Sequence, residues 1–101
     1  MPFDGTDFKI AARTTTEPWR SALLNAADQI EAHGWAKYSN GVEGGRRCAY
    51  FSILDQKDGW CEAINKFQQY IGAECIVLWN DAANRTEPEV VDALRNCARQ
   101  S

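Results

Sequence analysis

The densest group of polar side chains in the sequence follows a short apolar run near residue 80. It comprises Asn80, Asp81, Asn84, Arg85 and Thr86, and Trp79 directly precedes it. A carboxylate such as Asp81 can act as a general acid or base, and a helix starting just after this group offers free backbone donors to an anion. A local interpretation is also open, because Asn and Asp side chains often bond to their own turns and Trp79 can anchor the loop. If the protein has a binding site, we predict that it comprises Trp79, Asn80, Asp81, Asn84 and Arg85.

Histidine and cysteine, which can hold a metal or act in nucleophilic catalysis, are few and widely spaced. The sequence has one histidine, His33, and four cysteines, none in a Cys-x-x-Cys pair: Cys48, Cys61, Cys75 and Cys97. This spacing matches no familiar zinc site, although zinc held by cysteines is an alternative that metal analysis would settle. A Cys–His catalytic pair is a further alternative, but His33 is better explained as a cation near a helix C-terminus. We predict no catalytic residue, no metal site and no cofactor, and we expect free, buried thiols.

The clearest element that could position these residues is a helix between Thr16 and Gly34. Thr16 suits an N-cap, and Pro18 suits the first turn. Apolar residues then recur with helical spacing at Trp19, Leu23, Ala26 and Ile30. Gly34 is typical of the residue after a helix, and Trp35 follows where a contact back to the last turn is expected.

Two further helices are predicted in the second half of the chain. One covers residues 58–71, with Asp58 as N-cap and Gly72 as stop, and its apolar stripe is Trp60, Ile64, Phe67 and Ile71. The other begins at a capping box formed by Thr86 and Glu89. Its apolar face comprises Val90, Val91, Leu94, Cys97 and Ala98.

The remaining segments are ambiguous. Residues 47–54 favour a short helix, although their aromatic and β-branched residues also suit a strand. Residues 74–79 form a β-branched run typical of a buried strand, and residues 6–11 alternate in polarity. The sequence therefore predicts a mainly α fold, a single domain over residues 1–101. We expect a bundle of three to four helices, with residues 1–14 as an extended N-terminal arm and room for one or two short strands, at 6–11 and 74–79.

Four tryptophans are unusual for a chain of 101 residues. Trp19 and Trp60 each open an apolar stripe, whereas Trp35 and Trp79 lie beside turns. The simpler interpretation is a tryptophan-rich core. The sharper interpretation is a protein interface, where tryptophan is enriched among the residues that dominate binding.

Several of these residues together resemble the signature of a known family. The signature runs through Trp79-Asn80-Asp81, Arg85-Thr86, Glu89-Val90, Leu94 and Ala98, and His33-Gly34-Trp35 precedes it. In these residues the chain resembles a family of small uncharacterised bacterial and bacteriophage proteins, over about residues 19–98. Cys48-Ala49 also matches the middle of that family, whereas residues 50–53 depart from it. The resemblance implies an intracellular bacterial or phage context and supplies no activity.

Composition narrows the choice of partner. The net charge is −3, the pI is about 5.0 and basic residues are scattered, which argues against nucleic acid. No apolar run approaches the ~20 residues that cross a bilayer, and the first residues do not read as a signal peptide, so we expect a cytoplasmic protein without a membrane partner.

These observations favour a non-enzymatic protein that binds another protein or forms a homodimer. By analogy with phage proteins, such a protein can inhibit a host protein. The alternative is a small enzyme or ligand-binding protein that uses the loop at Asn80 and Asp81. A concave pocket that brings Asp81 close to His33 or to a cysteine would favour that alternative.

Overall fold

The structure, a computed structural model, describes residues 17–100 as five helices without a sheet. The helices are α1 (Pro18–His33), α2 (Ala49–Leu54), α3 (Trp60–Ile71), α4 (Ile76–Asn80) and α5 (Glu87–Ala98). The predicted mainly α fold is confirmed. The helices outnumber the predicted three to four because both ambiguous middle segments form short helices. The predicted arm over 1–14 and the strand at 6–11 lie outside the described residues.

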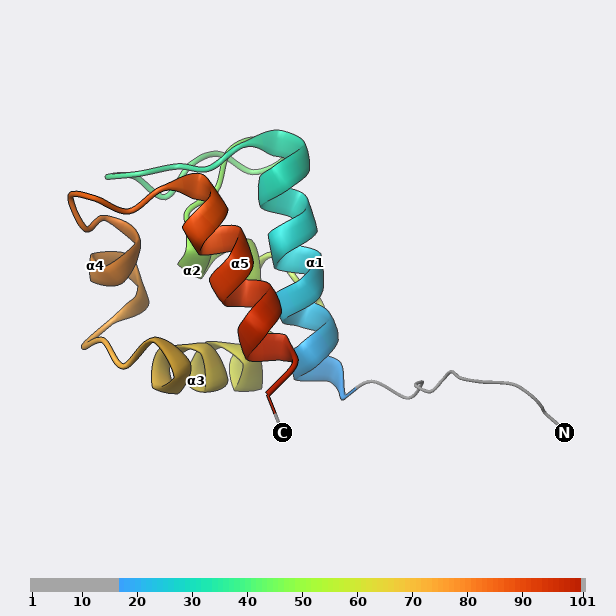
Figure 1. Cartoon of the computed structure of the whole chain (residues 1–101). Coiled ribbons are helices and arrows are strands. Elements are labelled where there is room, and N and C mark those ends of the chain that lie inside the picture. Colours follow the sequence, from blue (N-terminus) through green and yellow to red (C-terminus); the bar gives the residue numbers. More distant parts are fainter. Residues whose placement is uncertain (1–16, 101) are drawn as a thin grey trace, which may run out of the picture.

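Helices α1 and α5 form the centre of the fold and lie side by side (Figure 1). Helices α2 and α3 also pack against α1, and α4 packs against α2 and α3. The core is built from the fully buried side chains of Leu23, Ala26, Ile30, Ile53, Phe67, Val90 and Leu94. Full burial of one large apolar side chain contributes about 1.5–3 kcal/mol to folding. The predicted stripe of α1 and the predicted face of α5 therefore meet in one core.

The ends of α1 follow from local sequence. Pro18 occupies the first helical position, where its missing N–H costs nothing. The N-cap is Glu17, without a side-chain capping bond, so the cap predicted at Thr16 is wrong by one residue. At the other end, Gly34 has a φ of 105°, and its N–H donates to the Ile30 carbonyl at 2.8 Å. The predicted stop at Gly34 is confirmed.

Helix α3 begins at Trp60, two residues after the predicted Asp58, because Gly59 is its N-cap. Gly59 has a φ of 75°, and a Cβ at this position would lie 2.4 Å from the carbonyl carbon of Pro18. Glycine alone combines this backbone conformation with so close an approach. The start of α3 is thereby seated against the start of α1. The predicted stop at Gly72 is confirmed, with a φ of 66°.

The two middle segments are helical, and each has a thiol at its N-cap. Helix α2 confirms the helix favoured over 47–54, whereas the strand predicted at 74–79 is wrong because α4 occupies most of it. A β-branched run needs a neighbouring strand to pair with, and residues 17–100 contain none. Cys48 Sγ accepts from the Phe51 N–H at 3.5 Å, and Cys75 Sγ accepts from the Leu78 N–H at 3.4 Å.

The predicted tryptophan-rich core is right only in part. Trp19 is buried, Trp35 and Trp79 are half-buried, and Trp60 is 41% exposed. The cysteines are all free, as predicted, but they differ in burial: Cys48 and Cys97 are buried, Cys75 is half-buried and Cys61 is exposed. The predicted burial of Trp60 and Cys61 is wrong because both residues lie in the first turn of α3, which faces solvent.

The capping box predicted at the start of α5 is present. The Thr86 N–H donates to Glu89 Oε1 at 3.1 Å, and the whole predicted apolar face of this helix is buried. Arg95 then fastens α5 to α1 with bonds of 2.9 Å to Asp28 and 2.7 Å to Glu31. Among the described residues, no helix has the length and apolar character needed to cross a membrane.

Candidate functional site

The five residues predicted as a binding site lie at the end of α4 and in the loop that leads to α5 (Figure 1). Asn80 is the last residue of α4 and is fully buried. Its Oδ1 accepts from Trp35 Nε1 at 2.6 Å and from the Ala49 N–H at 3.0 Å. Its Nδ2 donates to the Ala36 carbonyl and to Asp81 Oδ1, both at 3.0 Å. These four bonds use the full capacity of the amide and tie together three segments of the chain.

Asp81 extends this network into the segment between the first two helices, residues 34–48, which we call the α1–α2 loop. Asp81 Oδ1 accepts from the Tyr38 N–H at 2.8 Å. Tyr38 has a φ of 66° and is the one non-glycine residue in the described part of the chain with a positive φ. This conformation costs a non-glycine residue roughly 1–2 kcal/mol, so the bond to Asp81 helps to hold a strained backbone.

Lys37 holds the same two loops together from another side, and Arg85 fastens the loop after α4 to the end of that helix. Arg85 Nε donates to the Trp79 carbonyl at 3.0 Å, and its guanidinium lies 4.1 Å from the centroid of the Trp79 ring. That ring meets Phe67 edge-on, with 5.4 Å between centroids. Lys37 Nζ donates to the carbonyls of Ala83 at 2.9 Å and Arg85 at 3.1 Å. Both cations are therefore engaged within the fold.

Asn84 differs from the other four predicted residues. It is exposed, and its side chain makes no hydrogen bond within residues 17–100. The predicted site thus combines one exposed residue with three, Trp79, Asn80 and Arg85, that bind other parts of the chain. Asp81 is half-buried and shares one carboxylate oxygen between two donors. That these residues bind a partner stays a prediction.

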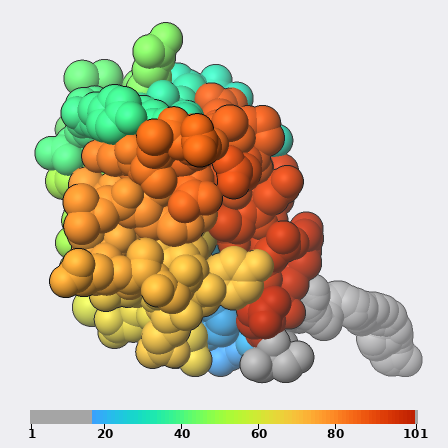
Figure 2. Space-filling view, turned by 60° about the vertical axis from the view of Figure 1, so that its left-hand side comes forward, coloured from blue at the N-terminus to red at the C-terminus, as the bar shows by residue number. Residues whose placement is uncertain are grey.

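Two exposed residues of the α1–α2 loop were missed by sequence reasoning. Tyr38 is 69% exposed and Val42 is 65% exposed. Val42 lies at the tip of a tight turn. Gly41 is required beside it because the two sides of the turn lie so close together that a Cβ at Gly41 would be 1.9 Å from the Arg46 carbonyl oxygen. Figure 2 shows this loop in green beside the orange residues of α4 and the following loop. The sequence signal that could have found them is the presence of an aromatic and a β-branched residue in a segment otherwise typical of turns.

The far end of the α1–α2 loop is held by an ion pair. Arg47 Nε and Nη2 donate to the two carboxylate oxygens of Asp55, each at 2.8 Å. Gln29 Nε2 donates to the same carboxylate at 2.7 Å. The bonds from Arg47, and secondarily from Gln29, hold the pKa of Asp55 below its usual range despite partial burial. The loop is therefore fixed at one end by Asp81 and at the other by Asp55.

The remaining candidates lie apart from this network or are unsuited to catalysis. His33 is exposed and borders a shallow hollow with Asp28, Glu43 and Asp55, which contains neither Asp81 nor a cysteine. Burial raises the pKa of the Cys48 thiol, the opposite of what a nucleophilic thiolate needs. Within residues 17–100, no group of three or more His, Cys, Asp and Glu side chains is arranged to hold a metal ion.

Comparison of the chain with curated proteins and with solved structures found no match. The model of one family, described as a family of unknown function (DUF6197), matches residues 14–100. This match covers all five helices and both of the loops that Asn80 and Asp81 join. The chain therefore belongs to this family of unknown function.

Proposed function

We propose that the chain is a non-enzymatic protein-binding module that contacts its partner through the α1–α2 loop and the adjoining loop after α4. In this proposal Asn80 and Asp81 position the loop, and Tyr38 and Val42 make the contact. The observation that carries the proposal is the ring of Tyr38, which is exposed on a strained backbone that Asp81 holds.

Within residues 17–100 the side chain of Tyr38 makes no hydrogen bond that would offset the strain of its backbone. Glycine or asparagine would adopt this backbone with less strain. The ring is exposed, and Lys37 Nζ lies 5.4 Å from its centroid, a contact that contributes about 0.5–1 kcal/mol at an exposed site. Strained residues cluster at binding sites, and tyrosine is enriched among residues that dominate binding energy. These facts support a contact with a partner outside the chain.

The surroundings of Tyr38 suggest the chemistry of the partner. Val42 adds a second exposed apolar side chain, and Glu43 and Arg46 are exposed charges at the rim of the turn. A complementary protein would offer an apolar pocket to Tyr38 and charged groups of opposite sign to the rim. Following the resemblance to bacterial and phage proteins, we assign the chain to the bacterial cytoplasm. In its sharper form, the proposal is that the chain inhibits a host protein.

The geometry argues against the enzymatic alternative. Asp81 lies near Cys48, but burial and, to a smaller extent, the Asp81 carboxylate both raise the pKa of that buried thiol. The Asn80 amide has no capacity left for a substrate, and Asp81 is bonded to Tyr38 and to Asn80. Turnover of a metabolite by the purified chain, with no partner recovered from its host, would overturn the protein-binding proposal.

Photocrosslinking of the full chain in its host tests the contact directly. A photoreactive phenylalanine analogue replaces Tyr38 in one sample and Tyr70 in the matched control, since Tyr70 is also an exposed aromatic residue, on α3. We expect one discrete crosslinked protein from position 38 that is absent from position 70. The same products at both positions, or a crosslinked dimer of the chain itself, would contradict a dedicated heterologous partner.

The variant Tyr38→Asn separates binding from folding. Asparagine tolerates a positive φ, so the free energy of unfolding should stay constant or rise by up to about 1 kcal/mol. Loss of the ring should weaken the crosslinked partner's affinity at least roughly 30-fold, the effect of a hot-spot residue worth about 2 kcal/mol. Urea denaturation and a binding titration measure the two effects. Unchanged affinity in this variant would show that Tyr38 is not the contact residue.

A further inference from the structure

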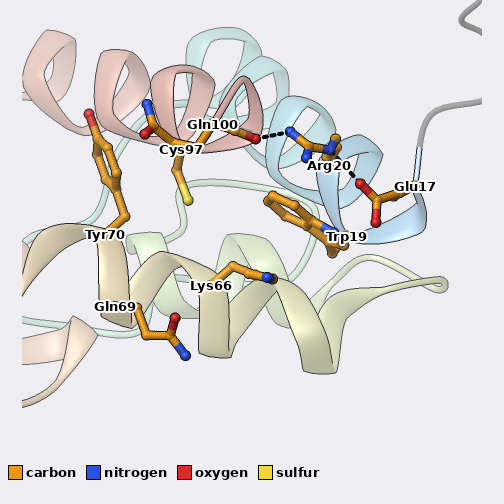
Figure 3. A pocket seen from close by; sticks show the side chains of 8 residues that line it. All are labelled: Glu17, Trp19, Arg20, Lys66, Gln69, Tyr70, Cys97 and Gln100. Atoms are coloured by element: carbon orange, nitrogen blue, oxygen red, sulfur yellow. Dashed lines mark hydrogen bonds and ion pairs between the residues drawn. The ribbon is translucent and has the colours of Figure 1, made fainter.

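A cavity lies at the end of the molecule away from the α1–α2 loop, between the start of α1, the middle of α3 and the end of α5 (Figure 3). Its volume is about 520 Å³, within the range of sites that bind small molecules. Its walls include two cations, Arg20 and Lys66, together with Trp19, Tyr70 and Cys97. None of these residues belongs to the network around Asn80.

The indole N–H of Trp19, a residue that lines this cavity, is a hydrogen-bond donor without an acceptor. The side chain is only 4% exposed, yet its Nε1 makes no hydrogen bond within the described part of the chain. Buried donors in native proteins almost always have a partner, as Trp35 has in Asn80. The Glu17 carboxylate at the cavity rim lies near the indole, and its pKa is lowered first by its bond to Arg20 and then by the Trp19 N–H. It does not, however, reach hydrogen-bonding geometry with Trp19 Nε1. An acceptor that enters the cavity would satisfy the indole.

Two cations flank the same indole ring. The guanidinium of Arg20 lies 4.3 Å and Lys66 Nζ lies 5.2 Å from the ring centroid of Trp19, and Figure 3 shows one above and the other below the ring. Arg20 is fixed by bonds to Glu17 Oε1 at 2.8 Å, to the Ala98 carbonyl at 2.9 Å and to the Gln100 carbonyl. Lys66 is exposed and forms no ion pair with any residue from 17 to 100, so its ammonium can turn towards a ligand.

The rest of the wall suits an uncharged molecular body. Tyr70 faces the cavity from α3, and Cys97 faces it from α5 (Figure 3). Burial raises the pKa of Cys97 to about 11, so its thiol is neutral and adds no charge at neutral pH. The positive groups therefore gather near Trp19, and the opposite side of the cavity is neutral.

We propose that this cavity binds a small organic anion. Its carboxylate or phosphate oxygens would bond to the Lys66 ammonium and the Trp19 indole N–H, and its body would pack against Tyr70 and Cys97. In the free protein the negative charge of Glu17 competes with the ligand for the positive charges of Lys66 and Arg20. The site shares no residue with the α1–α2 loop, so it is independent of the protein-binding proposal.

A nuclear magnetic resonance titration of the nitrogen-15-labelled full chain tests the site. Inorganic phosphate and acetate serve as separate probes, which distinguish a phosphate from a carboxylate ligand, and sodium chloride controls for ionic strength. We expect the indole N–H resonance of Trp19 to shift saturably with at least one anion, while that of Trp35 stays in place. Trp19→Phe keeps an aromatic ring but lacks the indole N–H, so the resonance that disappears in this variant is that of Trp19. The variant should also bind the anion more weakly. Equal shifts of all four indoles, or none beyond the chloride control, would overturn the proposal.

Charge variants sharpen the test. Lys66→Gln should weaken the anion's affinity roughly tenfold because it removes a charge-assisted bond. The matched control is Lys57→Gln, an exposed lysine that borders a different hollow, and it should leave the affinity unchanged. Glu17→Gln should strengthen binding because it removes the internal competitor. Equal effects of the two lysine variants would show a response to net charge alone and contradict a specific site. Tyr38→Asn should not alter anion affinity, so the failure of one proposal remains distinct from the failure of the other.

Discussion

Asn80 shows how one polar side chain can join distant parts of a small protein. Its amide serves the indole of Trp35, the Ala49 N–H and the Ala36 carbonyl, none of which lies within 30 residues of it in the sequence. Removal of the amide leaves these groups without partners, and each unpaired buried group costs about 1–3 kcal/mol. We expect Asn80→Ala to lower the free energy of unfolding by about 3 kcal/mol.

Urea denaturation measures this change, with the slope against urea expected to stay constant. The matched control is Asn84→Ala, because Asn84 is exposed and makes no side-chain bond within residues 17–100. The control should change the free energy of unfolding by less than about 0.5 kcal/mol. Equal losses in the two variants would mean that the bonds of Asn80 contribute little.

The lowered pKa of Asp55 predicts that the free energy of unfolding depends on pH. Its pKa in the folded chain is lowered mainly by the two bonds from Arg47, so folding favours the ionised carboxylate. The resulting stability is present above the pKa of an unfolded aspartate, about 4, and is lost as the pH falls through the lower folded value. Asp55→Asn should remove about 1 kcal/mol at neutral pH and make the loss of stability on acidification shallower. Parallel pH profiles for the variant and the native chain would contradict this role.

At the scale of the helices, Gly59 links the starts of α1 and α3. A side chain at this position would meet both a positive φ and the backbone of Pro18. We expect Gly59→Ala to lower the free energy of unfolding by about 3 kcal/mol. The matched control is Gly72→Ala, which also has a positive φ but no atom within 4 Å of the added Cβ, so it should cost only about 1 kcal/mol. Thermal or urea unfolding that ranks the two variants equally would exclude the steric contribution.

The helices that could be predicted are those with a long apolar period. The stripe of α1 and the face of α5 each extend over about three turns, and both are buried as predicted. Helix α4 has only five residues, too few to show a period, and its Ile-Val pair is more typical of strands. Spacing alone predicts Trp60 in the core, but spacing does not reveal whether a neighbouring helix extends far enough to cover this residue.

The candidate site was predictable to a smaller extent. Sequence composition indicates that Asn80 and Asp81 lie near a polar turn, and the structure places them at the end of α4. Their partners could not be predicted, because Trp35 and Tyr38 are more than 40 residues away and no local pattern specifies that contact. The exposed ring of Tyr38 follows from this pairing, so it also could not be predicted.

At the scale of the whole molecule, the helices share one core, and this predicts cooperative unfolding. Each of the five helices contributes buried side chains to that core, α4 through Ile76, and Asn80 ties α4 to the loops. Tryptophan fluorescence and far-ultraviolet circular dichroism should therefore give the same midpoint and slope in urea. A separate, earlier transition in fluorescence would show that the end of the molecule near Trp35 and Trp79 opens on its own.

The pairing of α1 with α5 also has a consequence for biosynthesis. Arg20 bonds to the Ala98 carbonyl across 78 residues, and the apolar stripe of α1 is covered by the helix that the ribosome makes last among the five. At a synthesis rate of about 5–20 residues per second, α1 waits several seconds for its partner. During that interval the face of Leu23 and Ile30 is open to chaperones, so the nascent chain should depend on them until α5 emerges.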